Sequence, residues 1–94
     1  MLRKVTQDSA FKSSLSVILR FIALDSKTKA QHFKKGLRQG LDSLIYMPYK
    51  FRKSVYFDDK SIRDYIYKGY CIPYVIDEEN EQILLLDIIK WNEK

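Results

Sequence analysis

Apolar residues in the first half of the chain recur at intervals of three or four, which is the period of an amphipathic helix. One such face consists of Phe11, Leu15, Ile18, Leu19 and Ile22. Asp8 or Ser9 can accept hydrogen bonds from the first free N–H groups, so we expect a helix from there to about residues 24–26. Charged and small polar residues lie off this face, which favours a helix packed on a protein core over one lying on a membrane.

A second apolar face predicts another helix, from near Ser26 to about Tyr46. Its apolar positions are Ala30, Phe33, Leu37, Leu41 and Leu44. Pro48 ends the pattern because proline has no N–H to continue a helix. The short link between the two helices predicts an antiparallel hairpin. Gly36 and Gly40 lower helix propensity, and we expect them to admit the close approach of another backbone segment.

The second half of the chain changes to a pattern typical of strands. Three runs rich in Val, Ile, Leu and Tyr, beginning near Ser61, are separated by Lys68-Gly69 and by an acidic turn at residues 77–81. Neither connection is long enough for a crossover helix, so we expect a three-stranded antiparallel meander. Residues 2–6 are expected to add an edge strand. The predicted fold is α+β, with an N-terminal antiparallel helix hairpin packed on a small antiparallel β-sheet, in one domain that covers residues 1–94.

The third run, Gln82 to Lys90, is apolar on both faces until Asp87, so we expect it to be the most buried strand. Pro73 in the second run would deprive a central strand of a ladder hydrogen bond, and a β-bulge is therefore expected there. Cys71 is the only cysteine, which excludes an internal disulfide. We expect it to be a small buried strand residue rather than a reactive thiol.

Composition excludes several other classes of protein. The longest apolar run, residues 83–86, is far too short to cross a bilayer, and the N-terminus has no apolar signal region. We therefore expect a soluble cytoplasmic protein without membrane contact. One histidine and one cysteine do not provide the spacing of a zinc site, so neither a metal nor a cofactor is expected. His32 lies among lysines and is expected to be a surface residue rather than a catalytic one.

The net charge of +5 is unevenly distributed along the chain. Residues 1–53 carry twelve Lys or Arg and three acidic residues, whereas residues 54–94 carry five and nine. Such asymmetry is typical of a basic face that meets a polyanion or an acidic protein partner. A solvated surface with no partner would have the same composition, so charge alone leaves both interpretations open.

Aromatic residues alternate with cations in the segment from Pro48 to Asp59, which is expected to be a loop. The aromatic positions are Tyr49, Phe51, Tyr56 and Phe57, and the cationic positions are Lys50, Arg52 and Lys53. Rings that stack on bases, with cations on phosphates, would make this loop a nucleic-acid contact. The same residues would equally suit a loop whose rings plug into the edge of the sheet.

Several of these features together resemble the RelE/ParE superfamily of bacterial toxins over nearly the whole chain. They are Pro48 after the second helix, Arg63 at the start of a strand, and the strand segment GYCIPYVID at residues 69–77, which the acidic turn and an Ile-rich strand follow. The resemblance implies the toxin of a type II toxin–antitoxin pair. Such toxins are held inactive by a small acidic antitoxin protein, and they meet operator DNA only through that antitoxin.

The resemblance leaves the target of the toxin open. Members similar to RelE cut messenger RNA in the ribosome, and they commonly place Arg where this chain has Cys71. They also carry Arg and a later Tyr beyond the last strand, where this chain has Trp91-Asn92-Glu93-Lys94. A branch with a catalytic Glu and His pair is poorly matched, because the single His is in the second helix. Cleavage beside a 2′-hydroxyl needs an acid, a base and cations, so these departures weigh against a ribonuclease.

Members similar to ParE poison DNA gyrase and need no acid–base set, so gyrase is the favoured target. A ribosome-dependent mRNA endonuclease is the alternative, which leaves open whether the chain is an enzyme. A non-toxic RNA- or protein-binding module is a third interpretation. The candidate target or nucleic-acid contacts are Lys50, Arg52, Lys53, Arg63, Lys90, Trp91 and Lys94. The candidate antitoxin contacts are Lys34, Lys35, Arg38 and Arg52.

Overall fold

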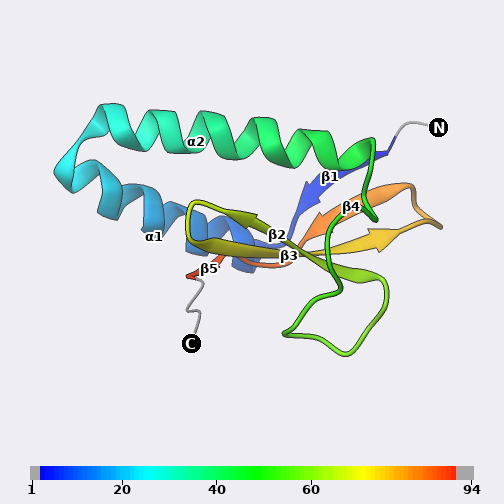
Figure 1. Cartoon of the computed structure of the whole chain (residues 1–94). Coiled ribbons are helices and arrows are strands. Elements are labelled where there is room, and N and C mark those ends of the chain that lie inside the picture. Colours follow the sequence, from blue (N-terminus) through cyan, green and yellow to red (C-terminus); the bar gives the residue numbers. More distant parts are fainter. Residues whose placement is uncertain (1–2, 91–94) are drawn as a thin grey trace.

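A computed structural model describes residues 3–90 of the chain. Two helices pack on one face of a five-stranded sheet (Figure 1). The elements are β1 (Lys4–Gln7), α1 (Ser9–Asp25), α2 (Lys27–Asp42), the 3₁₀ turn η1 (Ser43–Ile45), β2 (Ile62–Tyr67), β3 (Tyr70–Asp77), β4 (Gln82–Leu85) and β5 (Ile89–Lys90). This arrangement confirms the predicted α+β class.

Both helices begin at side-chain caps that the sequence predicted. The Asp8 carboxylate accepts a hydrogen bond from the backbone N–H of Ala10 at 3.0 Å. Ser26 is the single residue between the helices, and its hydroxyl accepts from the N–H of Lys29 at 3.2 Å. A link of this length turns the chain back on itself, which confirms the antiparallel hairpin. The regular part of α2 ends at Asp42, and η1 carries the chain on to the expected end near Tyr46.

The sheet has the strand order β1-β4-β3-β2, and it is mixed rather than wholly antiparallel. The predicted meander of β2, β3 and β4 is antiparallel throughout. The predicted edge strand lies at Lys4–Gln7 rather than at residues 2–6, and it runs parallel to β4. Parallel pairing is feasible here because the two strands are separated by both helices and by the β2–β3 hairpin.

The prediction of one continuous third strand from Gln82 to Lys90 is wrong, because the hydrogen-bond ladder breaks between β4 and β5. Opposite β3, Tyr74 pairs with Leu85, but Cys71 pairs with Ile89. Three residues of this segment therefore face two residues of β3, which is a β-bulge. One of those two residues is Pro73, which accepts from the N–H of Leu86 at 2.9 Å but has no N–H to return. The register of β3 with β2 continues through Pro73 without a break, so the bulge lies in the segment that pairs with Pro73 and not in the second run, where it was expected.

The most buried strand is β3 rather than the third run, contrary to expectation. β2 pairs with one of its edges, β4 and β5 pair with the other, and five of its eight residues are buried. Ile72, Tyr74 and Ile76 join the core on the helix side. Cys71 is fully buried on the other side, as predicted.

The two glycines of α2 admit tyrosine side chains rather than another backbone. A Cβ at Gly36 would collide with the hydroxyl of Tyr67, and one at Gly40 would collide with the hydroxyl of Tyr65. The Tyr67 hydroxyl donates to the carbonyl of Phe33 at 3.1 Å. Glycine is thus required because the rings of β2 stand against the helix backbone.

Candidate functional site

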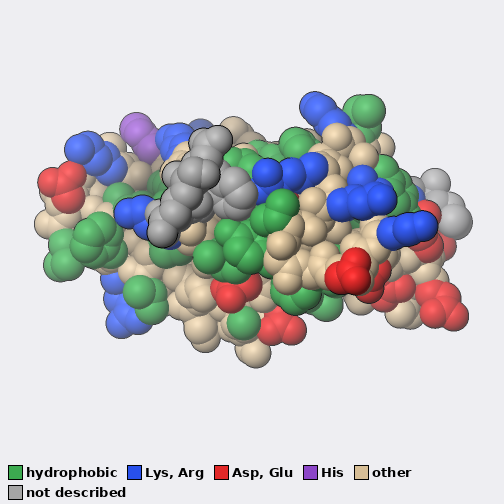
Figure 2. Space-filling view, turned by 60° about the horizontal axis from the view of Figure 1, so that its bottom comes forward, with side chains coloured by type: hydrophobic (Ala, Val, Ile, Leu, Met, Phe, Trp, Pro, Cys, Tyr) green, Lys and Arg blue, Asp and Glu red, His purple; other side chains and the backbone are tan. Residues whose placement is uncertain are grey.

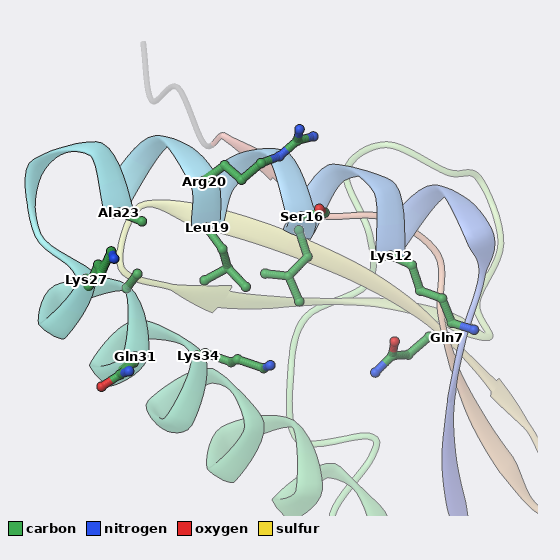
Figure 3. A pocket seen from close by; sticks show the side chains of 11 residues that line it. Gln7, Lys12, Ser16, Leu19, Arg20, Ala23, Lys27, Gln31 and Lys34 are labelled. Carbon is green, nitrogen blue, oxygen red and sulfur yellow. The ribbon is translucent and has the colours of Figure 1, made fainter.

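A groove of about 720 Å³ lies between α1 and α2. Its lining residues are Gln7, Lys12, Leu15, Ser16, Leu19, Arg20, Ala23, Lys27, Ala30, Gln31 and Lys34. In Figure 3, Leu19 points from α1 into the space between the helices, and Lys34 reaches toward it from α2. The floor of the groove is therefore apolar.

The charge around this groove has one sign. Four of its 11 lining residues are Lys or Arg, and none is acidic. A second hollow of about 250 Å³ continues from it past Val5 and Arg38, and shares Gln7, Leu15 and Lys34 with it. An apolar floor with a cationic rim is complementary to an amphipathic segment with acidic flanks.

Helix α1 is only partly covered by the rest of the chain. Phe11 is the one residue of this fully described helix that is wholly buried, although five positions form its predicted core face. Leu15, Ile18, Leu19 and Ile22 are only half-buried against the core. The helix therefore retains apolar surface that a partner would bury.

The structure places the four candidate antitoxin contacts in different regions of the surface. Lys34 lines the groove and Arg38 lines its continuation. Lys35 is exposed on α2 but lines neither hollow, and Arg52 lies on the loop after η1. The basic rim of the groove also includes three residues that sequence reasoning missed, namely Lys12, Arg20 and Lys27. These residues could have been predicted from the antiparallel hairpin, because the polar residues beside the apolar face of each helix meet where the two helices face each other.

The aromatic and basic loop, residues 46–61, is fastened to the outer edge of β2. Ser54 donates its N–H to the carbonyl of Ile62 at 2.9 Å, and Asp64 donates its N–H to the carbonyl of Arg52 at 3.1 Å. The Asp64 carboxylate, which is only 1% exposed, accepts from the N–H of Val55 at 3.0 Å. The Arg52 guanidinium lies 3.4 Å from the same carboxylate oxygen. This loop is therefore held in one conformation by a buried acid.

Arg63 fastens the beginning of the same loop from the opposite face of the sheet. Its guanidinium donates to the carbonyl of Phe51 at 3.1 Å and lies 5.2 Å from the centre of the Tyr49 ring. The buried Tyr74 hydroxyl donates to the carbonyl of Pro48 at 2.6 Å. The Phe51 ring packs edge-on against Tyr65, with centroids 5.1 Å apart. Phe51 therefore packs into the edge of the sheet, as one of the two interpretations of the loop expects. Tyr56 and Phe57, by contrast, are each 43% exposed.

The structure does not bring the candidate target contacts into one patch. Lys50 and Lys53 are exposed on the loop, but Arg52 and Arg63 face opposite sides of β2. Lys90 pairs with Tyr70 at the start of β3, whereas Arg63 pairs with Tyr74. Four strand residues separate these points, a distance of about 13 Å. The two other candidates, Trp91 and Lys94, lie outside the described residues.

The chemistry of the remaining polar groups is limited. Burial raises the pKa of the Cys71 thiol to about 12, and the nearby Asp64 charge adds to the rise. The thiol is therefore neutral and unreactive at physiological pH. His32 is exposed on α2, as predicted. Among residues 3–90, no three His, Cys, Asp or Glu side chains gather closely enough to hold a metal ion. Neither of the described helices has the length and apolar character needed to cross a membrane.

Comparisons with known proteins agree with this architecture. A solved structure described as the chromosomal ParDE TA system from P. aeruginosa contains a chain with the same fold. The two chains superpose with a TM-score of 0.75 at 12% sequence identity, over 97% of this chain and 98% of that one. No curated protein matches the chain in sequence. Residues 5–93 match the sequence profile of a family described as the ParE toxin of the type II toxin–antitoxin system parDE. Because this match covers nearly all of the sequence, the chain belongs to the ParE toxin family.

Proposed function

We propose that this chain is a growth-inhibiting toxin and that a small acidic antitoxin neutralises it by binding the groove between α1 and α2. The observation that carries the proposal is the groove itself, with an apolar floor and four cations among its lining residues. An amphipathic antitoxin helix would bury the half-exposed face of α1 and place its acidic flanks beside Lys27 and Lys34. The cations would chiefly speed association and set specificity, while the apolar contacts would supply most of the affinity.

This proposal is tested by co-expression of the chain with the product of its neighbouring reading frame, followed by pull-down and titration. Leu19→Asp should weaken the complex by about 10- to 100-fold, because it places a charge on the apolar floor and forfeits about 1.5–3 kcal/mol of burial. Lys34→Glu should weaken it by several-fold and reduce its dependence on salt. The adjacent Lys35→Glu is the matched control, since Lys35 lines no groove. Failure to form a complex, or equal effects of the two lysine variants, would refute this binding site.

We further propose that the target is DNA gyrase rather than the ribosome. This choice is supported by the roles of the two arginines that a ribonuclease would need at its phosphates. Arg52 lies against the Asp64 carboxylate, and Arg63 donates to the Phe51 carbonyl. Both therefore stabilise the loop. Binding to operator DNA is proposed to occur only through the antitoxin.

Expression of the chain without antitoxin distinguishes the two targets. The gyrase proposal expects arrested growth, induction of the DNA-damage response and gyrase inhibition by the purified protein. Codon-specific cuts in messenger RNA, detected by primer extension and reduced by Arg52→Ala or Arg63→Ala, would instead establish the ribosome-dependent endonuclease. Arrested growth with neither result would exclude both targets.

A further inference from the structure

The tip of the 46–61 loop presents apolar side chains to solvent in an unusual concentration. Val55 is 60% exposed, and Tyr56 and Phe57 are each 43% exposed. They are consecutive in sequence, and Figure 2 shows hydrophobic side chains exposed among Lys and Arg on the side of the molecule from which this loop projects. A run of exposed apolar residues is unfavourable for solubility unless a partner covers it.

The buried Asp64 helps to fix the backbone conformation of this tip. The carboxylate accepts the Val55 N–H at 3.0 Å, and the Ser54 hydroxyl accepts the Tyr56 N–H at 3.1 Å. The Asp64 carboxylate is also close enough to the Cys71 thiol to contribute to the raised pKa of that thiol. Burying a charge costs solvation free energy that an ion pair and hydrogen bonds offset only in part. The position of Asp64 below the loop instead fixes the backbone that carries Val55 and Tyr56.

The charges next to the tip indicate the kind of partner. Asp58 and Asp59 directly follow Phe57, and Ser61 donates two hydrogen bonds to Asp59, at 2.9 and 2.7 Å. These hydrogen bonds lower the pKa of Asp59, so its carboxylate stays ionised. Lys53 and Lys60 flank the same run, so residues 53–60 carry two charges of each sign. A tip without net charge gives no attraction for nucleic-acid phosphates, whereas its apolar side chains suit an apolar protein surface.

We propose that the loop tip formed by Val55, Tyr56 and Phe57 is the surface with which this toxin docks on its target, and that the occupant is a protein with an apolar docking surface. Asp64 acts as a positioning residue that holds the tip ready for docking, which limits the ordering cost of association. The inference rests on the proposed toxin function, and it replaces the basic positions of the loop with its apolar tip as the main contact. It also separates this surface from the groove between the helices.

The test compares growth inhibition, antitoxin binding and binding to purified DNA gyrase. Val55→Ser with Phe57→Ser should raise the inducer level needed for growth arrest, and should weaken gyrase binding, by at least about tenfold. The matched control is Val17→Ser with Phe21→Ser, which removes two apolar residues that are 57% and 72% exposed on α1. The control should remain toxic, and both variants should still form a complex with the antitoxin. Undiminished toxicity of the tip variant would overturn the inference.

Asp64→Asn separates positioning from packing. Asparagine keeps an oxygen for the Val55 N–H but loses the charge that faces Arg52, so hydrogen exchange at the Val55 and Tyr56 amides should accelerate while toxicity falls. Asp58→Asn, at an exposed position, is the control and should not change that exchange. If exchange at these amides is unchanged in Asp64→Asn, then Asp64 does not position the tip.

Two further outcomes identify which step of the argument fails. A wild-type chain that does not arrest growth contradicts the proposed function, whatever the tip variants do. A toxic wild type that binds ribosomes rather than gyrase, with the steep salt dependence of phosphate contacts, contradicts the protein partner. Docking through the apolar tip should instead show only a shallow dependence on salt.

Discussion

Replacement of Gly36 by alanine tests the contact that locks α2 onto the sheet. Alanine usually stabilises the interior of a helix by about 1 kcal/mol relative to glycine. At this position the new methyl group would occupy the space of the Tyr67 hydroxyl, and the next ring atom, Cζ, lies 3.3 Å from it. The ring cannot easily withdraw, because it packs edge-on against Phe33 at 5.1 Å and donates to the Phe33 carbonyl. We therefore expect Gly36→Ala to destabilise the protein.

The size of the effect follows from two opposing terms. Overpacking of a well-filled interface costs about 1–3 kcal/mol, and the gain in helix propensity offsets part of it. The net loss should be about 1–2 kcal/mol, which lowers the Tm by roughly 5–15 °C in a domain of this size. Tyr67→Phe alone should cost about 1 kcal/mol for the lost hydrogen bond. In the Tyr67→Phe background, Gly36→Ala should be neutral or stabilising by up to about 1 kcal/mol, because the obstructing hydroxyl is gone.

A double-mutant cycle in urea measures this coupling directly. The four proteins are the wild type, Gly36→Ala, Tyr67→Phe and the double variant, and the expected coupling energy is about 2 kcal/mol. Ala30→Gly is a useful companion, since it changes helix propensity in the same helix without touching Tyr67. If Gly36→Ala changes the free energy of unfolding equally in both backgrounds, the steric explanation for this glycine is wrong.

Two other predictions concern buried or hydrogen-bonded acids. Cys71 should resist thiol reagents near pH 8 in the folded protein and react in urea. Because its pKa in the folded state is raised to about 12, the neutral thiol stabilises the fold below pH 9, and this contribution should disappear between pH 9 and about 12. Cys71→Ala should lack this loss of stability. Rapid labelling of the native thiol would contradict its burial. Hydrogen bonds from Asn80 lower the pKa of Asp77, so Asn80→Ala should raise that pKa in an NMR titration and lower the Tm at neutral pH. The difference should vanish as the pH falls through the lowered pKa of folded Asp77, since the lowered pKa stabilises the fold only where Asp77 is ionised.

The helices and strands were predictable because their patterns are local. The caps at Asp8 and Ser26 have their partners within three residues, so sequence proximity already determines them. The break between β4 and β5 was harder to predict from the sequence. Residues 83–89 are apolar except for Asp87, and only the pairing of this segment with Pro73 shows why the ladder cannot continue past Leu85. Parallel pairing of β1 was equally hard to predict, because it joins residues that are 78 positions apart in the sequence.

Composition of the site was predictable, but its geometry was not. The sequence indicated a basic, aromatic loop, yet Arg52 and Arg63 are two of the residues that fasten it. Asp64 had no special feature in sequence, since an acid between Arg63 and Tyr65 also suits an exposed strand position. Its importance depends on burial beneath the loop, which is a tertiary property. The same holds for Lys12 and Arg20, whose contribution to the groove depends on how the two helices face each other.

The positions of the groove and of the loop tip lead to a last prediction about neutralisation. Tyr65 and Tyr67 of β2 face α2, so Asp64, which directly precedes Tyr65, faces away from the helices, and the tip that it holds lies on that other side of the sheet (Figure 1). A partner helix confined to the groove would leave Val55 and Phe57 uncovered. We therefore expect an acidic peptide that spans only the groove-binding part of the antitoxin to bind without abolishing toxicity, whereas the full antitoxin neutralises by reaching beyond the groove. Titration of both against the free toxin, with gyrase binding as the readout, decides this: complete competition by the short peptide would show that the tip is not a separate docking surface.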